Sequence, residues 1–440
     1  MGKEEACERC KPLFEKIQQE HTAHLKYFET RIAELERRLL AYENAHTPPS
    51  KNKRHYPKRE PTGNPVGAPQ GHPGTTRPTA TPDKIVDVKQ EVCEKCLHLL
   101  GKPAKIMKRI IEDIPEPQSA IVTQYNVHAY LCKNCATVNI PSHPDLPAEG
   151  RFGYNLQTQI ALLKYEDRLP LEKIASNVQR QYHLTITPAA ILEILDRVTG
   201  SCEPVYCRIR QQIKQAANVY ADETGQKVQG KQWWTWAFVT LTHALFLIRK
   251  SRGQKPIEEA LGDDYQGILN CDGWKSYPQK VRRIQRCWAH LLRESKYLAE
   301  QEEGQARLLY QELCELFAKL KQLRLAVLAQ QEREKQHELL IAHMRRLIGR
   351  AKAYTKLRKF AVKIENGLAH WFTCVLYPEA EPTNNKAERA LREIVVQRNI
   401  TGTLRNERGT HRMEVLMTCL QTWKLQGLNT FSMLRLCLSS

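Results

Sequence analysis

Residues 219–225 read Val-Tyr-Ala-Asp-Glu-Thr-Gly, and two later stretches complete their pattern: Ile-Leu-Asn-Cys-Asp-Gly-Trp at 268–274 and Asn-Asn-Lys-Ala-Glu-Arg at 384–389. Asp222 and Asp272 each follow an apolar, β-prone run, and Glu388 falls on the first turns of a predicted helix. Two aspartates on neighbouring strands and a glutamate on a later helix can hold a pair of divalent cations. Such a pair activates an attacking oxygen and stabilises the leaving oxygen of a phosphodiester.

The order of elements around these acids predicts an α/β catalytic domain. Strand patterns precede a long segment with helical periodicity, and the third acid follows that segment. This is the element order of a ribonuclease H-like domain with a helical insertion at about 291–372. The strands are expected at Val219–Glu223, Trp233–Thr240, Ala244–Arg249, Gly267–Cys271 and Ile284–Trp288.

Each acid also has a purely structural interpretation. Both aspartates are possible turn residues at strand ends, and Glu388 is spaced for an i,i+4 ion pair with Arg392. The presence of all three acids, each in such a motif, favours a catalytic role over these structural ones. Asn385 lies three residues before Glu388, so both share one helical face, whereas strand alternation turns Glu223 away from Asp222.

A Cys-Trp-Ala-His stretch at 287–290 has C-x-x-H spacing, but no second pair accompanies it. We therefore expect His290 to form a bond near the acidic site, in preference to holding zinc.

The overall charge favours a polyanionic partner. The chain has 67 Lys and Arg against 48 Asp and Glu, a net charge of +19, and nucleic acid is the commonest partner of so basic a protein. The alternative is a basic protein without such a partner. No apolar run is long enough to span a membrane and no secretory signal is visible. We expect a protein of the cytoplasm, associated with the nucleoid.

Four cysteines in two C-x-x-C pairs predict one structural Zn²⁺ in a ribbon-type site. The pairs are Cys93 with Cys96 and Cys132 with Cys135, and the spacer between them contains strand-like stretches. A third pair, Cys7 and Cys10, either binds metal across a dimer or is an incidental surface pair.

Residues 11–45 are predicted to form a helix whose apolar positions repeat every three or four residues. That pattern suits a short coiled coil and self-association; packing on the same chain is the alternative. A Pro-rich basic tether follows. It either tracks DNA phosphates or is a solvated linker, and its DNA-binding candidates are Lys51, Lys53 and Arg54.

Residues 155–215 are helical by periodicity, with a helix-turn-helix-like break before Thr187-Pro188, a cap followed by a first-turn proline. This segment has two interpretations: it recognises DNA as a helix-turn-helix, or its helices only pack against the rest of the protein. The arginines after Glu388 are candidates for holding non-scissile phosphates, with a solvated helix as the alternative. They are Arg389, Arg392, Arg398 and Arg405.

The chain is thus predicted to be a multidomain α+β protein. The expected parts are a coiled-coil helix at 1–45, a basic linker at 46–84, a zinc-ribbon DNA-binding module at 85–140, a helix-turn-helix-like domain at 141–215, and a ribonuclease H-like domain at 216–440 that ends in basic helices at 384–440.

Over nearly its whole length the sequence resembles transposases of the insertion sequence 66 family. The resemblance rests on the Asp222-Glu-Thr, Cys271-Asp-Gly-Trp, Cys287-Trp-Ala-His and Asn384-Asn-Lys-Ala-Glu-Arg motifs and on the cysteine pairs. It implies that Asp222, Asp272 and Glu388 are a DDE triad. With two Mg²⁺ or Mn²⁺ ions, the triad would nick element ends and join the freed 3′ hydroxyls to target DNA.

The implied partners are element and target DNA, a second copy in a homodimer or higher oligomer, and accessory proteins of the same element. Two alternatives to an active transposase are considered. One is a catalytically silent, transposase-derived DNA-binding protein, against which an intact triad argues. The other is a structure-selective nuclease, which has no need of the N-terminal modules.

Overall fold

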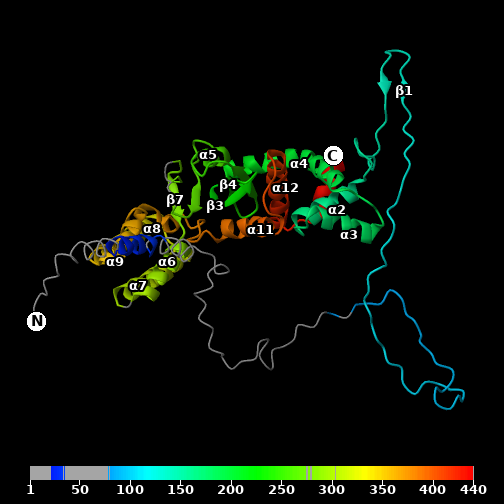
Figure 1. Ribbon diagram of the computed structural model, residues 1–440, viewed down its shortest axis with the longest axis horizontal. Helices are drawn as coiled ribbons and strands as arrows, with labels where there is room; N and C mark the ends of the chain where they lie inside the picture. Colours follow the sequence, from blue (N-terminus) through cyan, green and yellow to red (C-terminus); the bar gives the residue numbers. More distant parts are fainter. Residues whose placement is uncertain are drawn as a thin grey trace, which may run out of the picture.

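The computed structural model describes residues 21–32, 34, 78, 80–273, 276–277, 280–302 and 304–439. A five-stranded sheet occupies the middle of the body, with a helical insertion at one end and helices α2 to α4 at the other (Figure 1). Cys7, Cys10, Lys51, Lys53 and Arg54 lie outside the described residues, as do most of the predicted N-terminal helix and linker. None of the described helices is long and apolar enough to cross a membrane.

The sheet is mixed and has the strand order β5-β4-β3-β6-β7, which is consistent with a ribonuclease H-like core. Its central strand pairs antiparallel with β4 and parallel with β6. The outer pairs are antiparallel β4–β5 and parallel β6–β7. The strands are β3 (Asn218–Val228), β4 (Lys231–Val239), β5 (Ala244–Arg249), β6 (Ile268–Cys271) and β7 (Arg283–Arg286), and α5 (Lys255–Leu261) precedes β6.

The predicted positions of the five strands are confirmed, with two differences in their ends. The last strand ends at Arg286, two residues early, because Trp288 already begins α6. β3 continues to Val228, five residues beyond its predicted end, so Asp222 lies within the strand. A two-residue turn explains the extension: Gln229 (φ 50°) and Gly230 (φ 75°) are both left-handed, and this turn geometry matches the twist of a long hairpin. The buried Trp236 and Phe238 side chains of β4 anchor the pair in the core.

Helix α12 (Glu407–Leu425) covers the outer edge of β5. Three of its side chains, one turn apart, accept hydrogen bonds from alternate backbone amides of the strand. Glu414 accepts from Ile248 (2.8 Å), Thr418 from Phe246 (3.0 Å) and Thr422 from Ala244 (3.1 Å). At the other edge, the Thr373 hydroxyl donates to the Ile284 carbonyl of β7. Both edges of the sheet are therefore bonded by side chains.

The helices before the sheet pack on it and share its core. Buried residues of α2 (Tyr154–Tyr165), α3 (Leu171–Tyr182) and α4 (Pro188–Gln215) form one continuous apolar cluster with those of the sheet, α12 and α13 (Thr430–Ser439). The predicted start of α4 is confirmed, because the Thr187 hydroxyl accepts from the Ala190 amide and Pro188 opens the helix.

The predicted helical insertion is confirmed and has its own core. Its apolar cluster includes Trp288, Phe372 and the inner faces of three long helices. The elements are α6 (Trp288–Gln301), α7 (Gln305–Leu325), α8 (Gln330–Lys352), α9 (Thr355–Glu365), η2 (Leu368–His370) and α10 (Thr373–Leu376), and α11 (Asn385–Thr401) follows. The insertion thus separates Asp272 from Glu388 in sequence and forms a second apolar cluster, which Ile268 of β6 joins to the sheet.

Residues 80–145 form an extended arm outside both cores, with the short strands β1 (Tyr130–Leu131) and β2 (Val138–Asn139) near one end (Figure 1). Apolar side chains along the arm, such as Ile111 and Ile121, are exposed. Residues 21–32 are helical, and their apolar side chains Leu25, Phe28 and Ile32 are also exposed. Neither segment is held by burial of apolar surface.

Candidate active site

The sheet brings Asp222 and Asp272 together through the register of β3 and β6. Tyr220 pairs with Asn270 in parallel, so Asp222 and Asp272 occupy the equivalent positions two residues on. β6 ends at Cys271 while β3 continues beside β4. The end of the shorter strand therefore leaves room for carboxylates at the centre of the sheet.

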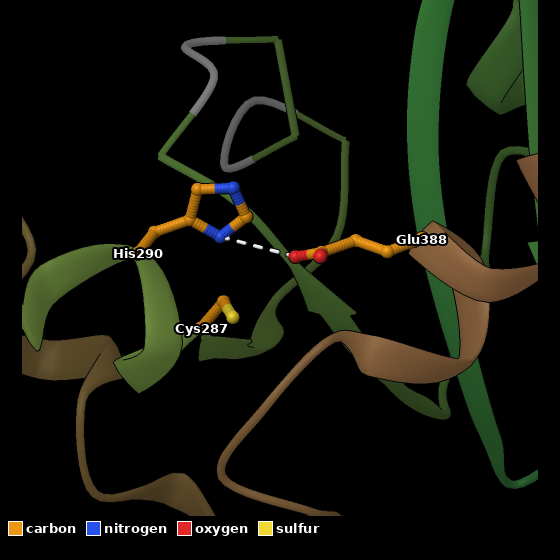
Figure 2. A group of neighbouring side chains, drawn as sticks. All are labelled: Cys287, His290 and Glu388. Carbon is orange, nitrogen blue, oxygen red and sulfur yellow. Dashed lines mark ion pairs between the residues drawn. The ribbon is translucent and has the colours of Figure 1, made fainter. Parts of the chain in front are cut away.

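Helix α11, which packs on β3 and β4, carries the third acid in its first turn. The Oε1 atom of Glu388 lies 3.5 Å from Nδ1 of His290, at the start of α6 (Figure 2). The charges of Asp272 and Glu388 both act on Asp222, so the structure places the three acids predicted from sequence near one another. Among the described residues, however, their carboxylate oxygens do not all lie within 4.8 Å of one another. His290 lies beside Glu388.

The electrostatics of Asp222 reflect this crowding. Burial is the largest cause that raises its carboxyl pKa well above the ordinary value of 3.8, and the negative charges of Glu223, Asp272 and Glu388 raise it further. The Glu223 amide, which donates to Asp222 Oδ1 at 3.0 Å, opposes the shift. A buried carboxylate surrounded by like charges fits a divalent cation, which supplies the missing positive charge.

The carboxylate of Glu223, in contrast, accepts hydrogen bonds from side chains of the protein itself. Nε and Nη2 of Arg252 donate to Oε1 at 3.0 and 2.8 Å, and the Tyr277 hydroxyl donates to Oε2 at 2.6 Å. The guanidinium also stacks over Trp234, 4.5 Å from the ring centre. Burial raises the pKa of Glu223, while Tyr277 and Arg252 oppose the shift. Both carboxylate oxygens have donors, so Glu223 does not fit a metal ligand.

A chain of hydrogen bonds joins the three segments that carry the acids. The buried Asn384 side chain donates to the Ala221 carbonyl at 2.8 Å, and its backbone amide donates to Cys287 Sγ at 3.2 Å. The Cys287 amide donates to the Cys271 carbonyl at 2.9 Å. Each acid follows one member of this network closely: Asp222 follows Ala221, Asp272 follows Cys271, and Glu388 lies four residues after Asn384. The network therefore fixes the spacing of the three acids.

Sequence reasoning missed Asn384 and selected its neighbour. Asn385 is exposed at the start of α11, whereas Asn384 is fully buried. The available signal was that Asn384 precedes the helix and so lies at the point where the chain approaches β3. Periodicity cannot reveal that its side chain turns toward a strand 163 residues earlier.

The predicted DNA-contacting arginines fall into two groups. Arg389, Arg392 and Arg405 are exposed. Arg398 is half-buried and donates to the Gly225 carbonyl of β3, so it joins α11 to the sheet. Burial lowers its pKa from the usual value of an arginine. Among these four arginines of the described residues, Arg398 alone is taken up by a contact within the fold.

The two cysteine pairs have the same local geometry. In each, the first cysteine carbonyl accepts from the amide four residues on, and the first cysteine amide donates to the carbonyl five residues on, all at 2.9 Å. The residue after each pair, Leu97 (φ 57°) or Ala136 (φ 54°), is left-handed. Among the described residues, however, the four sulfurs are not gathered into one group of donor atoms.

Comparison with known proteins agrees with this arrangement. An uncharacterized protein of Sinorhizobium fredii, y4jD, is 22% identical over 390 residues, which cover 80% of this chain and 75% of the relative. The sequence profile described as "Transposase IS66 family", a DDE transposase domain, matches residues 149–412. That match contains the whole sheet, all three acids and the helical insertion, and so the chain belongs to the IS66 family of DDE transposases.

Proposed function

We propose that this protein is the active transposase of a bacterial or archaeal insertion sequence, which cleaves DNA at element ends and joins the freed 3′ hydroxyls to target DNA. Family membership implies DNA transposition by phosphoryl transfer. The observation that carries the assignment of residues is the register of β3 and β6, which sets Asp222 and Asp272 at equivalent positions, with Glu388 in the first turn of the helix packed on β3. A protein that had lost the chemistry has no need to keep three repelling carboxylates together.

Asp222, Asp272 and Glu388 would hold two Mg²⁺ or Mn²⁺ ions. When bound, such ions supply an activated attacking oxygen and a stabilised leaving oxygen. The chain itself supplies the spacing of the ligands through Asn384 and Cys287. Arg252 and Tyr277 donate to both carboxylate oxygens of Glu223, which leaves the ions to the other three acids.

DNA would be held by surfaces around this cluster. Arg389 and Arg392 lie on the helix that carries Glu388, and Arg405 follows it, so their guanidinium groups are placed for non-scissile phosphates. We assign the two cysteine knuckles to one structural Zn²⁺ in a DNA-binding module, because each has a preformed local turn. The exposed apolar residues at 21–32 suit pairing with a second copy.

The test is a strand-transfer assay with a labelled element end, Mg²⁺ and the full-length protein. Asp222→Asn, Asp272→Asn and Glu388→Gln should each reduce joining by about a thousandfold, equivalent to a loss of about 4 kcal/mol of transition-state stabilisation. Glu365→Gln is the matched control, since Glu365 is an exposed acid of α9 paired with Lys352. Joining that survives all three substitutions contradicts the assignment. DNA binding by the wild type without any joining supports a silent DNA-binding protein instead.

A further inference from the structure

The Cys-Trp-Ala-His segment at 287–290 forms a second ligand group at the edge of the acid cluster. The side chains of Cys287 and His290 lie on one side of the Glu388 carboxylate (Figure 2). The Cys287 sulfur, one ring nitrogen of His290 and one Glu388 carboxylate oxygen all lie within 4.8 Å of one another. In the part of the chain that the structure describes, no other set of three His, Cys, Asp or Glu residues meets that spacing.

The spacing is close to that of a bound tetrahedral ion. Zinc bonds of about 2.0 to 2.3 Å place neighbouring ligand atoms about 3.3 to 3.8 Å apart. Nδ1 of His290 and Oε1 of Glu388 are already 3.5 Å apart. Cys287 and His290 are three residues apart at the start of α6, so both project from one side of the first turn. Small side-chain rotations are enough to enclose an ion.

The donor set selects a different metal from the one expected at the acids. Mg²⁺ prefers oxygen ligands, whereas one sulfur, one imidazole nitrogen and one carboxylate suit Zn²⁺ and leave its fourth position for water. Burial raises the pKa of the Cys287 thiol to about 11, and the Asn384 amide, 3.2 Å from the sulfur, opposes that rise, so a bound ion would have to displace the thiol proton. Cys287 is buried, but the His290 and Glu388 side chains are 21% and 27% exposed, which gives an ion a path from solvent.

We propose that Cys287, His290 and Glu388 form a regulatory site at which Zn²⁺ inhibits the enzyme. The inference rests on the proposed function, because Glu388 would belong to both sites. Zinc bound there neutralises the Glu388 carboxylate and holds it toward α6, so Asp222 and Asp272 lose their third partner. Imidazole and thiolate bind Zn²⁺ far more strongly than Mg²⁺, so excess Mg²⁺ does not displace the zinc.

Zinc binding is measured first, by equilibrium dialysis of the full-length protein against Zn²⁺ and metal analysis. The wild type should hold one more ion per chain than Cys287→Ala or His290→Ala. Cys374→Ala is the matched control, since Cys374 is also a fully buried cysteine at the start of a helix in the insertion. It should keep the extra ion. Equal zinc content in the wild type and Cys287→Ala would falsify the site.

Inhibition is measured in the strand-transfer assay at fixed excess Mg²⁺ with increasing Zn²⁺. Activity of each variant is compared with its own zinc-free value. Half-inhibition of Cys287→Ala should need at least tenfold more Zn²⁺ than that of the wild type or Cys374→Ala. Equal sensitivity, or stimulation by Zn²⁺, overturns the regulatory role. If the wild type shows no strand transfer, the proposed function fails, while the zinc content still decides whether the site exists.

Discussion

The acid cluster and the two cysteine knuckles are both sets of metal-type ligands contributed by distant parts of the chain, but only the segments that carry the acids are joined through a packed core. Asp222 lies on β3 and Asp272 directly follows the adjacent strand β6, and buried residues surround both. The knuckles at 93–96 and 132–135 belong to an arm whose apolar side chains are largely exposed. Their local turns are formed, but no apolar core joins one knuckle to the other.

This difference shows two ways to build a metal site. Packing of the sheet positions the acids before any metal binds, and the cost is burial of Asp222 together with electrostatic repulsion, both of which raise its pKa. In the arm, no comparable burial opposes the loss of chain entropy, so metal binding itself would supply the free energy that joins the knuckles. Four experiments test this contrast, in order of decreasing expected effect on the catalytic body.

Removing the Asn384 side chain should have the largest effect. Asn384→Ala loses the bond to the Ala221 carbonyl, which holds the start of α11 on β3. We expect strand transfer to fall about 10- to 100-fold, as for other residues that orient metal ligands, and half-maximal activity to need more Mg²⁺. Asn385→Ala, at the exposed neighbouring position, should stay within threefold of the wild type. Equal losses in both variants contradict the positioning role, and thermal melting identifies variants that do not fold.

The acid cluster should make the metal-free protein less stable as pH rises. The pKa of Asp222 is higher in the folded state than its ordinary 3.8, so the folded state favours the protonated form. Its stabilising contribution is present below pH 3.8 and is lost as pH rises through the folded-state pKa, at about 1.4 kcal/mol per pH unit.

Urea unfolding of metal-free protein across this pH range measures the effect. Asp222→Asn should show a shallower decline than the wild type, while the raised pKa values of Glu223 and Glu414 contribute to both proteins. Parallel curves for the two proteins would mean that repulsion at Asp222 does not limit stability. Adding Mg²⁺ should reduce the decline only in the wild type.

Substitutions of the α12 side chains that bond the outer edge of β5 should destabilise the protein more than a similar substitution elsewhere on a helix. Thr418→Val keeps the side-chain shape but leaves the buried Phe246 amide without its acceptor, which should lower the free energy of unfolding by about 1 to 3 kcal/mol. Thr401→Val is the control, since the Thr401 hydroxyl donates only to the carbonyl of Gln397 in its own helix. It should cost less than about 0.5 kcal/mol. Similar values for both variants contradict a specific role at the edge.

Loss of a knuckle should leave the body almost unchanged. Cys93→Ser should abolish binding of the structural zinc and make residues 85–140 more sensitive to protease. The main thermal transition should move by no more than about 2 °C, the shift expected for less than 1 kcal/mol in a unit of this size. Cys207→Ser, at an exposed cysteine of α4, should retain the zinc. Unchanged zinc content in Cys93→Ser rules out the ribbon, and a large thermal shift shows that the arm stabilises the body.

Local patterns in the sequence were sufficient for the sheet and the helical insertion. Apolar runs bounded by turn residues located each strand, and the predicted bounds of β5 agree with the structure at both ends. The length of β3 was underestimated because its second half, Thr224 to Val228, is mixed polar and apolar, and depends on pairing with β4. Pairing is a tertiary effect that no single stretch of sequence reveals.

The same limit applies to the site. The three acids were found because each lies in a recognisable local motif. Asn384, Arg252 and Tyr277 were missed because their roles depend on contacts 29 to 163 residues away. Arg398 was assigned to DNA from its charge and position, but burial against the Gly225 carbonyl assigns it to the fold. Charge patterns cannot separate an arginine that faces solvent from one that crosses to a strand.

The acceptors that α12 presents to β5 have a consequence for how copies of this protein meet. An outer strand as apolar as Ala244-Leu-Phe-Leu-Ile248 is, when bare, a template for aggregation and strand exchange between molecules. With its alternate amides bonded to Glu414, Thr418 and Thr422, that strand offers no ladder to a neighbour. Copies brought to high local concentration on DNA are thus steered away from association through the edge of β5.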